Sequence, residues 1–368
     1  MIMNQMGSVI ITILDSITET SMPFNEFVLY RANHFRNERQ ILIVCNNPKP
    51  LPNVEISDNL EIEYIGENPL RWRGKLKKLI SMYDKKSYAI HLHQAGPSMK
   101  VLLMMLGTGF RKKVVFTIHS TFTGYKLHNK IRSYIDGLLS RYVVCCSNAS
   151  YANYPRSLKR LKGKRVLPIQ NGVDTDRIDR IIEGKDSDVH DGVVFVYVAR
   201  MIPLKNHSFL VDIAKRTLPQ AKFLLIGKED EGILQRIKAE GLEDRIECTG
   251  LIPRNDVFER LKNADVYLST STLEGLPVSV LEGMYAGMPA VLSDIPQHRE
   301  VAMNKDFVSV LPFDEDRWVT EINRFTEMNQ VELNSLGDKS RAYVKEYFSL
   351  EAMHDHYNEI YEMLRIKK

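Results

Sequence analysis

Short apolar runs, each followed by sequence with helical periodicity, recur along the whole chain of 368 residues. This alternation constrains the fold more than any other feature. The first run, SVIITILD at 8–15, is apolar at nearly every position, which is typical of a parallel strand covered on both faces. Further strands are predicted at 40–45, around 51–65, and at 87–93, 113–119, 141–147, 192–200, 221–227, 245–250, 264–270, 288–294 and 306–311. Repeated β–α units of this kind predict an α/β fold with doubly wound, Rossmann-like parallel sheets.

The chain is long enough for two domains with separate cores. The polar, glycine-containing stretch EGKDSDVHDG at 183–192 is typical of an interdomain linker. We therefore predict a first domain at 1–175, a linker at 176–192, a second domain at 193–345 and a C-terminal helix at 346–368. Packing back on the first domain is one arrangement open to that helix. Two such domains imply a central cleft, with ligands outside the carboxyl ends of the strands.

Composition and the lengths of the apolar runs argue against a signal peptide, a membrane-spanning helix and a zinc site. Hydrophobic residues make up 44% and charged residues 26%, as in ordinary globular proteins. The N-terminal apolar run lacks a basic flank and ends at Asp15, which favours a strand over a signal peptide. The longest other apolar run, VLLMMLGTGF, is far shorter than the roughly 20 residues that span a bilayer. The four cysteines lack zinc spacing, which favours reduced thiols.

Charge is distributed unequally between the two halves. Residues 1–170 contain 25 Lys and Arg and 11 Asp and Glu, a net charge of +14. The remaining residues contain 25 and 35, a net charge of −10. Such asymmetry indicates an anionic partner on the basic side.

The stretch LEGLPVSVLEGMYAGMP at 273–289 is the strongest candidate for a binding site. Glu274 and Glu282 are separated by seven residues, and Pro277 suits the first turn of a helix that contains Glu282. The N–H groups at Val278 and Ser279 would then form an anion site at the helix N-terminus. Two carboxylates beside an anion site suit a phosphate between two hydroxylated groups, as in a nucleotide-sugar.

An ordered set of landmarks accompanies this stretch. They are IQNGVD (169–174), VARMIPLKNH (198–207), LLIG (224–227), CTGLIPRND (248–256), STLEGLPVSVLEGMYAGMPAV (271–291) and FSLEAM (348–353). A lone pair of glutamates at this spacing occurs by chance in most proteins of this size, but the ordered set is much more specific. Over most of residues 165–365 the chain resembles the donor domain of retaining glycosyltransferases of family 4, which have the two-domain GT-B fold.

The resemblance implies roles for individual residues. Arg200 and Lys205 should bind the donor diphosphate and stabilise charge on the leaving phosphate. Glu282 should accept hydrogen bonds from the ribose, and Glu274 from hydroxyls of the transferred sugar. Further donor contacts are implied at Gly275, Leu276, Val278 and Ser279, and a pocket for the base at Leu251 and Ile252. His119, at the end of the strand at 113–119, matches a histidine that the family places near the transferred sugar.

Other positions are less distinctive. His91 and His93 form an HxH pair that could bind a metal, but no third ligand lies nearby and the family is generally metal-independent. We therefore expect neither metal nor cofactor. The loop SITETSMPFNE lacks the Gly-Gly pair that relatives often have after the first strand. Thr18, Thr20 and Ser21 could supply hydroxyls to the acceptor side instead.

Together with these observations, the resemblance implies a retaining hexosyltransferase that uses a UDP- or GDP-sugar. Its acceptor would be a hydroxyl of a lipid-linked or growing bacterial glycan, as in capsule, O-antigen or exopolysaccharide synthesis. No nucleic-acid partner is expected. A sugar-nucleotide epimerase of the same fold and a non-catalytic glycan-assembly protein remain alternatives.

A basic helix at 71–86 bears on the location of the protein. Its apolar stripe, Trp72, Leu76, Leu79, Ile80 and Tyr83, either faces the domain core or contacts a membrane. We predict that the protein is cytoplasmic and docks peripherally on the inner face of the plasma membrane. The predicted docking residues are Arg71, Trp72, Arg73, Lys75, Lys77, Lys78, Arg111, Lys112 and Lys113.

Overall fold

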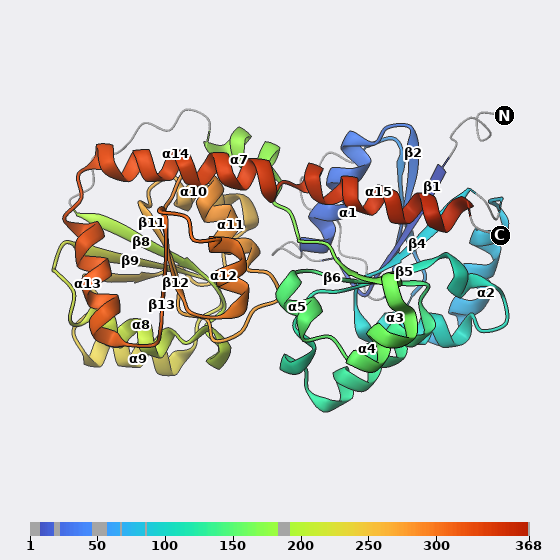
Figure 1. Ribbon diagram of the computed structural model, residues 1–368, viewed down its shortest axis with the longest axis horizontal. Helices are drawn as coiled ribbons and strands as arrows, with labels where there is room; N and C mark the ends of the chain where they lie inside the picture. Colours follow the sequence, from blue (N-terminus) through green and yellow to red (C-terminus); the bar gives the residue numbers. More distant parts are fainter. Residues whose placement is uncertain are drawn as a thin grey trace. The chain divides into compact units, whose positions relative to one another are not determined.

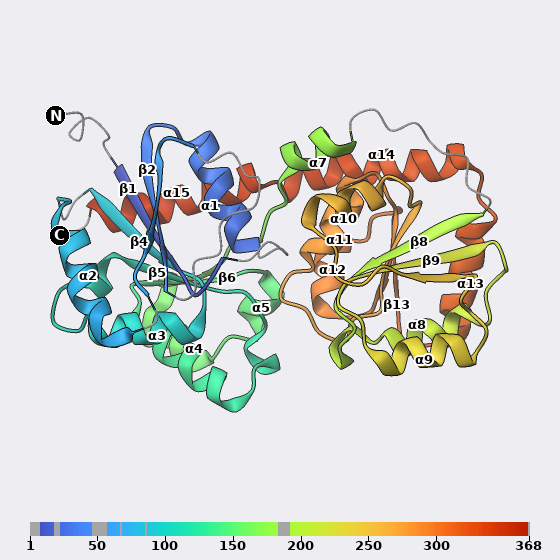
Figure 2. The ribbon, with the colours of Figure 1, turned by 180° about the vertical axis from the view of Figure 1, so that it is seen from behind.

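The computed structural model describes residues 8–17, 23–45, 57–66, 68–84, 87–182 and 192–366. It consists of two compact units, of which the first is Met1–Asn171 with Leu350–Lys368 and the second is Gly172–Ser349. Each unit is a parallel sheet covered by helices, as Figures 1 and 2 show, so the predicted fold class is confirmed. The linker was predicted at 176–192, and its first part was wrong, because Thr175–Ile182 forms helix α7 of the second unit. Residues 183–191 lie outside the described residues.

The sheet of the first unit has seven parallel strands in the order β3-β2-β1-β4-β5-β6-β7. They are β1 (Ser8–Leu14), β2 (Glu38–Val44), β3 (Leu60–Tyr64), β4 (Tyr88–Leu92), β5 (Val114–Ile118), β6 (Tyr142–Cys145) and β7 (Val166–Pro168). The strand order reverses between β1 and β4, which pair with each other. This is the switch point where sheets of this kind bind ligands, at the carboxyl ends of the strands.

Helices cover both faces of this sheet. They are α1 (Pro23–His34), α2 (Pro69–Ser81), α3 (Ala95–Met104), α4 (Leu127–Leu139), α5 (Asn148–Ala152), α6 (Arg156–Lys162) and α15 (Leu350–Ile366), with the 3₁₀ turns η1 (Phe110–Lys113), η2 (Phe122–Gly124) and η3 (Gly163–Arg165). Ile11 and Ile13 of β1 enter the core under α2 and α3, whereas Ile10 and Leu14 enter the core under α1 and α15. Successive strand residues point to opposite faces. Both faces are buried here, which explains the continuous apolar run.

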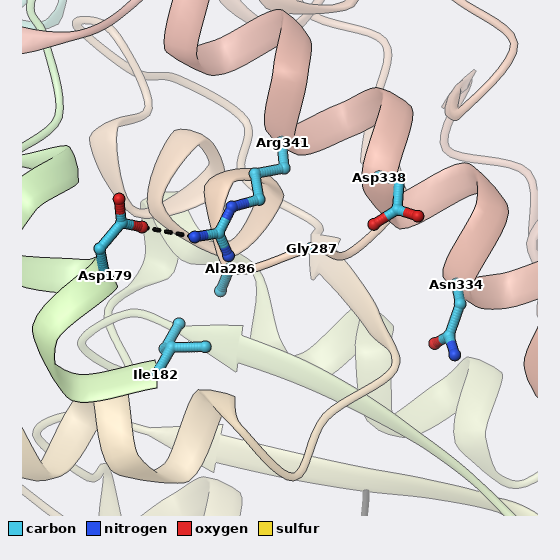
Figure 3. Close-up of a pocket in the computed structure, with 7 residues that line it drawn as sticks. All are labelled: Asp179, Ile182, Ala286, Gly287, Asn334, Asp338 and Arg341. Carbon is cyan, nitrogen blue, oxygen red and sulfur yellow. Dashed lines mark hydrogen bonds and ion pairs between the residues drawn. The ribbon is translucent and has the colours of Figure 1, made fainter. Parts of the chain in front are cut away.

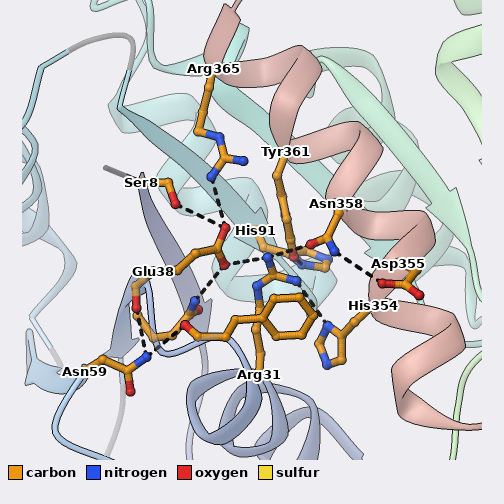
Figure 4. Close-up of polar contacts among 12 residues, drawn as sticks. Ser8, Arg31, Glu38, Asn59, His91, His354, Asp355, Asn358, Tyr361 and Arg365 are labelled. Carbon is orange, nitrogen blue, oxygen red and sulfur yellow. Dashed lines mark hydrogen bonds and ion pairs between the residues drawn. The ribbon is translucent and has the colours of Figure 1, made fainter. Parts of the chain in front are cut away.

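The C-terminal helix α15 is joined to the first unit by a buried polar network, drawn in Figure 4. Arg31 is almost fully buried and pairs with Glu38 at 2.5 Å. The Arg31 guanidinium also donates to Asn358 of α15 at 2.8 Å and lies over the ring of Tyr361 at 4.7 Å. Arg365 pairs with the same carboxylate of Glu38 at 3.0 Å. Helix α15 thus completes the core of this unit, although it follows the second unit in sequence.

Two of the predicted membrane-docking residues are buried, so their assignment was wrong. Trp72 is 1% exposed, and its indole N–H donates to the carbonyl of Gly66 at 2.7 Å. Lys113 is buried, and its ammonium donates to the carbonyl of Leu364 at 2.5 Å. The stripe of α2 therefore faces the core, as in an ordinary surface helix. The other predicted docking residues are exposed, namely Arg71, Arg73, Lys75, Lys77, Lys78, Arg111 and Lys112. None of the helices that the structure describes is long and apolar enough to cross a membrane.

Helix α4 turns small and polar residues inward, namely Ser133, Asp136 and Gly137. The carboxyl group of Asp136 is fully buried and accepts no hydrogen bond from the described residues. Burial raises the pKa of Asp136 from its ordinary 3.8 to about 9, with the nearby Arg132 opposing the shift. The folded protein therefore holds Asp136 protonated at neutral pH, whereas the unfolded chain has it ionised.

This difference predicts that stability falls as pH rises. At pH values below 3.8 both states are protonated, and the penalty grows until the folded state also ionises near pH 9. Asp136→Asn removes the proton uptake, so at pH 8 the variant should be more stable than the parent by up to ~6 kcal/mol. Near pH 4 the two proteins should unfold at the same denaturant concentration. Asp58→Asn, at an exposed position, is the control. A gain in stability that is equal at both pH values would contradict the burial argument.

The sheet of the second unit has six parallel strands in the order β10-β9-β8-β11-β12-β13. They are β8 (Val193–Val198), β9 (Ala221–Ile226), β10 (Ile246–Cys248), β11 (Val266–Ser269), β12 (Ala290–Ser293) and β13 (Val308–Leu311). Its helices are α7, α8 (His207–Ala214), α9 (Glu231–Ala239), α10 (Arg254–Leu261), α11 (Val278–Tyr285), α12 (Pro296–Ala302), α13 (Glu315–Thr326) and α14 (Gln330–Tyr347), with the 3₁₀ turn η4 (Pro203–Lys205). The strand order reverses between β8 and β11.

Candidate active site

The switch point of the second unit brings together residues that are far apart in sequence. Strands β8 and β11 pair side by side, and the loops after them lie at the carboxyl edge of the sheet. The loop after β8 contains Arg200 and Lys205, and the loop after β11 contains Glu274. All three residues were predicted as catalytic. The topology therefore places them at the edge where doubly wound sheets bind their ligands.

Lys205 and Glu274 form an ion pair, with the ammonium 2.5 Å from a carboxylate oxygen. Both side chains are mostly buried, at 19% and 13% exposed. Side-chain hydrogen bonds hold the two loops together. The hydroxyl of Thr270, just after β11, donates to the carbonyl of Lys205 at 3.0 Å, and the hydroxyl of Tyr197 in β8 donates to the same carbonyl at 3.0 Å. Tyr197 also shares a hydrogen bond of 2.8 Å with Ser271. The relative position of the lysine and the glutamate is thus fixed by hydrogen bonds of the protein itself.

Arg200 lies at the same strand end but is exposed. Its guanidinium makes no hydrogen bond or ion pair with the residues that the structure describes. A guanidinium in this state can bind a diphosphate without first giving up a protein partner.

Glu282 lies in helix α11 and is 3% exposed. The guanidinium of Arg254, the first residue of α10, contacts both oxygens of its carboxylate, one of them at 2.9 Å. Arg254 is a residue that the sequence analysis missed, although it lies within the landmark CTGLIPRND. The available signal was that a glutamate inside an apolar helix needs a buried partner.

The remaining predicted donor residues have mixed environments. The N–H of Val278 donates to the carbonyl of Leu276 at 2.9 Å, so the expectation that it faces a ligand was wrong. The side chain of Leu276 is buried in the core, and Gly275 and Ser279 are half-buried. Leu251 is exposed, whereas Ile252 packs against the core of this unit.

His119 follows β5 in the first unit and contacts His93 through ring nitrogens 2.9 Å apart. Burial lowers the pKa of His119 to about 3, so its imidazole is neutral at physiological pH. His93 stacks on His91 with ring centroids 3.8 Å apart. Both ring nitrogens of His91 are engaged, by Tyr361 and Thr117 at 2.7 Å each. Among the described residues, no three His, Cys, Asp or Glu side chains are placed to hold a metal ion.

The switch point of the first unit also has a polar contact that the sequence did not indicate. The N–H of Asp15, after β1, donates to the side-chain oxygen of Gln94, after β4, at 2.5 Å. The contact fixes the start of the loop that follows β1. Thr18, Thr20 and Ser21, predicted for the acceptor side, lie outside the described residues.

A pocket of about 490 Å³ lies elsewhere in the second unit, and Figure 3 shows its lining. Asp179 and Ile182 come from α7, and Arg341 comes from α14. Arg341 pairs with Asp179 at 2.5 Å, and Tyr285 donates to the same carboxylate at 2.9 Å. None of the predicted site residues lines this pocket, so it is separate from the candidate site.

Two family models match the chain in succession. The model described as "Glycosyltransferase Family 4" matches residues 27–177, in the first unit and the start of the second. The model described as "Glycosyl transferases group 1" matches residues 179–347, within the second unit. The second match includes Arg200, Lys205, Glu274 and Glu282.

Curated relatives have similar descriptions. The capsular polysaccharide biosynthesis glycosyltransferase CapH of Staphylococcus aureus is 25% identical over 266 residues, which cover 67% of this chain and 72% of CapH. The UDP-Gal:alpha-D-GlcNAc-diphosphoundecaprenol alpha-1,3-galactosyltransferase of Escherichia coli is 25% identical over 221 residues, which cover 55% of this chain and 56% of that enzyme.

Solved structures with this fold include the sucrose-phosphate synthase of Thermosynechococcus elongatus, at a TM-score of 0.75 and 18% identity over 97% of this chain and 99% of that one. HepE of Anabaena in complex with UDP and glucose matches at a TM-score of 0.71 and 16% identity over 96% and 99% of the two chains. At these identities the likeness shows the fold, which is GT-B. The two family models match residues 27–177 and 179–347 in succession, so the chain belongs to glycosyltransferase family 4.

Proposed function

We propose that this glycosyltransferase moves a hexose from a UDP- or GDP-sugar to a hydroxyl of a lipid-linked or growing glycan, with retention of anomeric configuration. The observation that supports the proposal most directly is the ion pair of Lys205 and Glu274 at the switch point of the second sheet. In this proposal the cation binds the diphosphate and the neighbouring carboxylate binds the sugar hydroxyls. Arg200 supplies a second cation at the same strand end.

In this proposal the bond between the sugar C1 and the diphosphate oxygen breaks. The acceptor oxygen bonds to C1 on the same face, and its proton passes to the departing phosphate. Lys205 and Arg200 stabilise the negative charge that develops on the diphosphate. Glu274 holds the sugar hydroxyls. The protein contributes positioning and electrostatic stabilisation rather than a nucleophile.

Glu282 has a different role in the same proposal. Its carboxylate receives the ribose hydroxyls while Arg254 keeps the buried charge compensated. The backbone around Leu251 and Ile252 lines the pocket for the base. No metal is needed, because lysine and arginine take the place of a cation at the diphosphate.

The names of the relatives support the choice of substrates. The Escherichia coli relative is named for UDP-galactose and a diphosphoundecaprenol acceptor, and HepE was solved with UDP and glucose. A nucleotide-sugar donor and a lipid-linked acceptor are therefore the first substrates to examine. With such an acceptor, the proposed reaction takes place at the cytoplasmic face of the plasma membrane.

The experiment that tests the function is a screen of UDP- and GDP-sugars by thermal shift, followed by transfer to lipid-linked acceptors in EDTA. We expect one donor to stabilise the protein and the product to keep the donor's anomeric configuration by NMR. Epimerisation of the donor without acceptor would indicate an epimerase. Binding without transfer or hydrolysis would indicate a non-catalytic assembly protein.

The two glutamates should respond differently to substitution. Glu274→Gln should mainly lower turnover, because its contacts strengthen as the sugar becomes cation-like. Glu282→Gln should weaken donor binding by about 1–3 kcal/mol, because charged hydrogen bonds to the ribose are lost. Calorimetry with the donor and initial rates separate the two effects. Negligible effects from both changes would contradict the assignment.

A further inference from the structure

Helix α4 exposes a continuous apolar stripe. Leu127, Ile131, Tyr134 and Leu138 are 75%, 53%, 37% and 47% exposed. Their spacing of four, three and four residues places them on one face of the helix. The opposite face, with Ser133, Asp136 and Gly137, is buried. Helix α4 thus exposes apolar side chains and buries small and polar ones, whereas an ordinary surface helix such as α2 does the opposite.

The stripe continues onto helix α6. The hydroxyl of Tyr134 lies 3.2 Å from that of Ser157 in α6. Leu161 is one turn further along the same face of α6 and is 63% exposed, whereas Leu158 is fully buried. Two helices therefore form one apolar surface on the first unit, which we call the α4–α6 face.

The chain segment that forms this face carries charges of almost one sign. Residues 91–170 contain 14 Lys and Arg and a single acidic residue, Asp136. That carboxyl group is buried within α4 and adds no negative charge to the surface. The exposed basic residues are Lys100, Arg111, Lys112, Lys126, Arg132, Arg156, Arg160 and Lys164.

We propose that the α4–α6 face docks on an anionic lipid surface. The arrangement has the features of an interfacial amphipathic helix, with apolar side chains toward the acyl region and basic side chains among the headgroups. Tyr134 suits the headgroup region because its ring is apolar and its hydroxyl is polar. A second copy of the same face is a poor partner, because pairing would bring like charges together. This inference does not depend on the proposed reaction and concerns a different surface from α2.

Sedimentation with vesicles tests the proposal. The intact protein should bind vesicles of phosphatidylcholine mixed with phosphatidylglycerol, and bind pure phosphatidylcholine much more weakly. Leu127→Ser, Ile131→Ser and Leu138→Ser together should lower partitioning at least ~10-fold, because the apolar contact is lost. Lys126→Glu, Lys130→Glu and Arg160→Glu together should lower it on the order of 100-fold, since each basic residue contributes about fivefold.

A matched triple variant on helix α2, Lys75→Glu, Lys77→Glu and Lys78→Glu, controls for net charge. Because α2 turns its apolar stripe inward, this variant should lose only a fewfold in partitioning once salt screens distant charges. All substituted side chains are at least partly exposed, so donor binding by the second unit should be unchanged.

Tyr134→Trp provides a second readout that depends on position. The two native tryptophans, Trp72 and Trp318, are buried, so a new indole on α4 can be followed separately. Its emission should shift to shorter wavelength with anionic vesicles and stay unchanged with neutral ones. The proposal is overturned by equal binding to both vesicles, by an α2 variant as impaired as the α4–α6 variant, or by no emission shift. It is also overturned if the protein is a dimer in solution and the triple serine variant is a monomer, because a second copy of the chain then covers the face.

Discussion

Replacing Arg254 by alanine is expected to lower the free energy of unfolding of the second unit by about 3–5 kcal/mol, the usual cost of removing one partner from a buried ion pair. The side chains of Arg254 and Glu282 are only 10% and 4% exposed, so water cannot replace the lost guanidinium. The alanine variant also loses the packing of the guanidinium over Phe258, at 4.6 Å. Urea unfolding monitored by circular dichroism measures the loss.

The same helix offers a matched control. Arg260 of α10 pairs with Glu247 at 3.2 Å, but both side chains are at least half exposed. Arg260→Ala should therefore cost less than about 1 kcal/mol. The double variant Arg254→Ala with Glu282→Ala should be more stable than Arg254→Ala alone, because no unpaired carboxylate remains buried. If the double variant is the less stable one, the ion pair is not what stabilises this site.

The fold could be predicted from sequence because its signal is local. Buried parallel strands are apolar at nearly every position, and the β–α alternation leaves few topologies open. The predicted strands at 8–15 and 221–227 correspond to β1 and β9 within a residue or two. The loops with Lys205 and Glu274 could be identified because they follow such strands.

The orientation of surface helices could not be predicted in this way. Both α2 and α4 have one apolar face together with basic residues, five in α2 and two in α4, so the sequence shows that each is amphipathic. It does not show which face the rest of the fold covers. In α2 the apolar face packs against the sheet around Trp72, whereas in α4 the residues Ser133 and Asp136 face inward. The sequence analysis therefore left the orientation of the stripe at 71–86 open, and it did not identify the exposed apolar residues of α4.

Partners distant in sequence were missed for a related reason. Arg254 is 28 residues from Glu282, and Arg31 is 327 residues from Asn358. No periodicity connects such positions, and only the requirement that a buried charge be compensated indicates that a partner exists. The sequence can thus indicate that a partner is needed without identifying it.

Lys205→Met should lower kcat by ~10²–10³-fold, because the proposed reaction then loses a preorganised cation at the leaving diphosphate. Donor binding should weaken less, since Arg200 remains at the same strand end. Initial rates at varied donor concentration separate kcat from KM. Lys215→Met, which removes another Lys–Glu pair of the second unit, should leave both constants unchanged. Lys205→Arg should retain part of the activity, because it keeps the positive charge.

A double variant distinguishes two ways in which Lys205 could act. If the lysine only holds Glu274 in place through their 2.5 Å contact, Lys205→Met with Glu274→Gln should be no slower than Glu274→Gln alone. If the lysine charge itself stabilises the leaving diphosphate, the double variant should be slower than either single variant. We expect the second result, because the charge on the diphosphate grows as its bond to the sugar breaks. Equal rates for the double variant and Glu274→Gln would assign Lys205 to positioning alone.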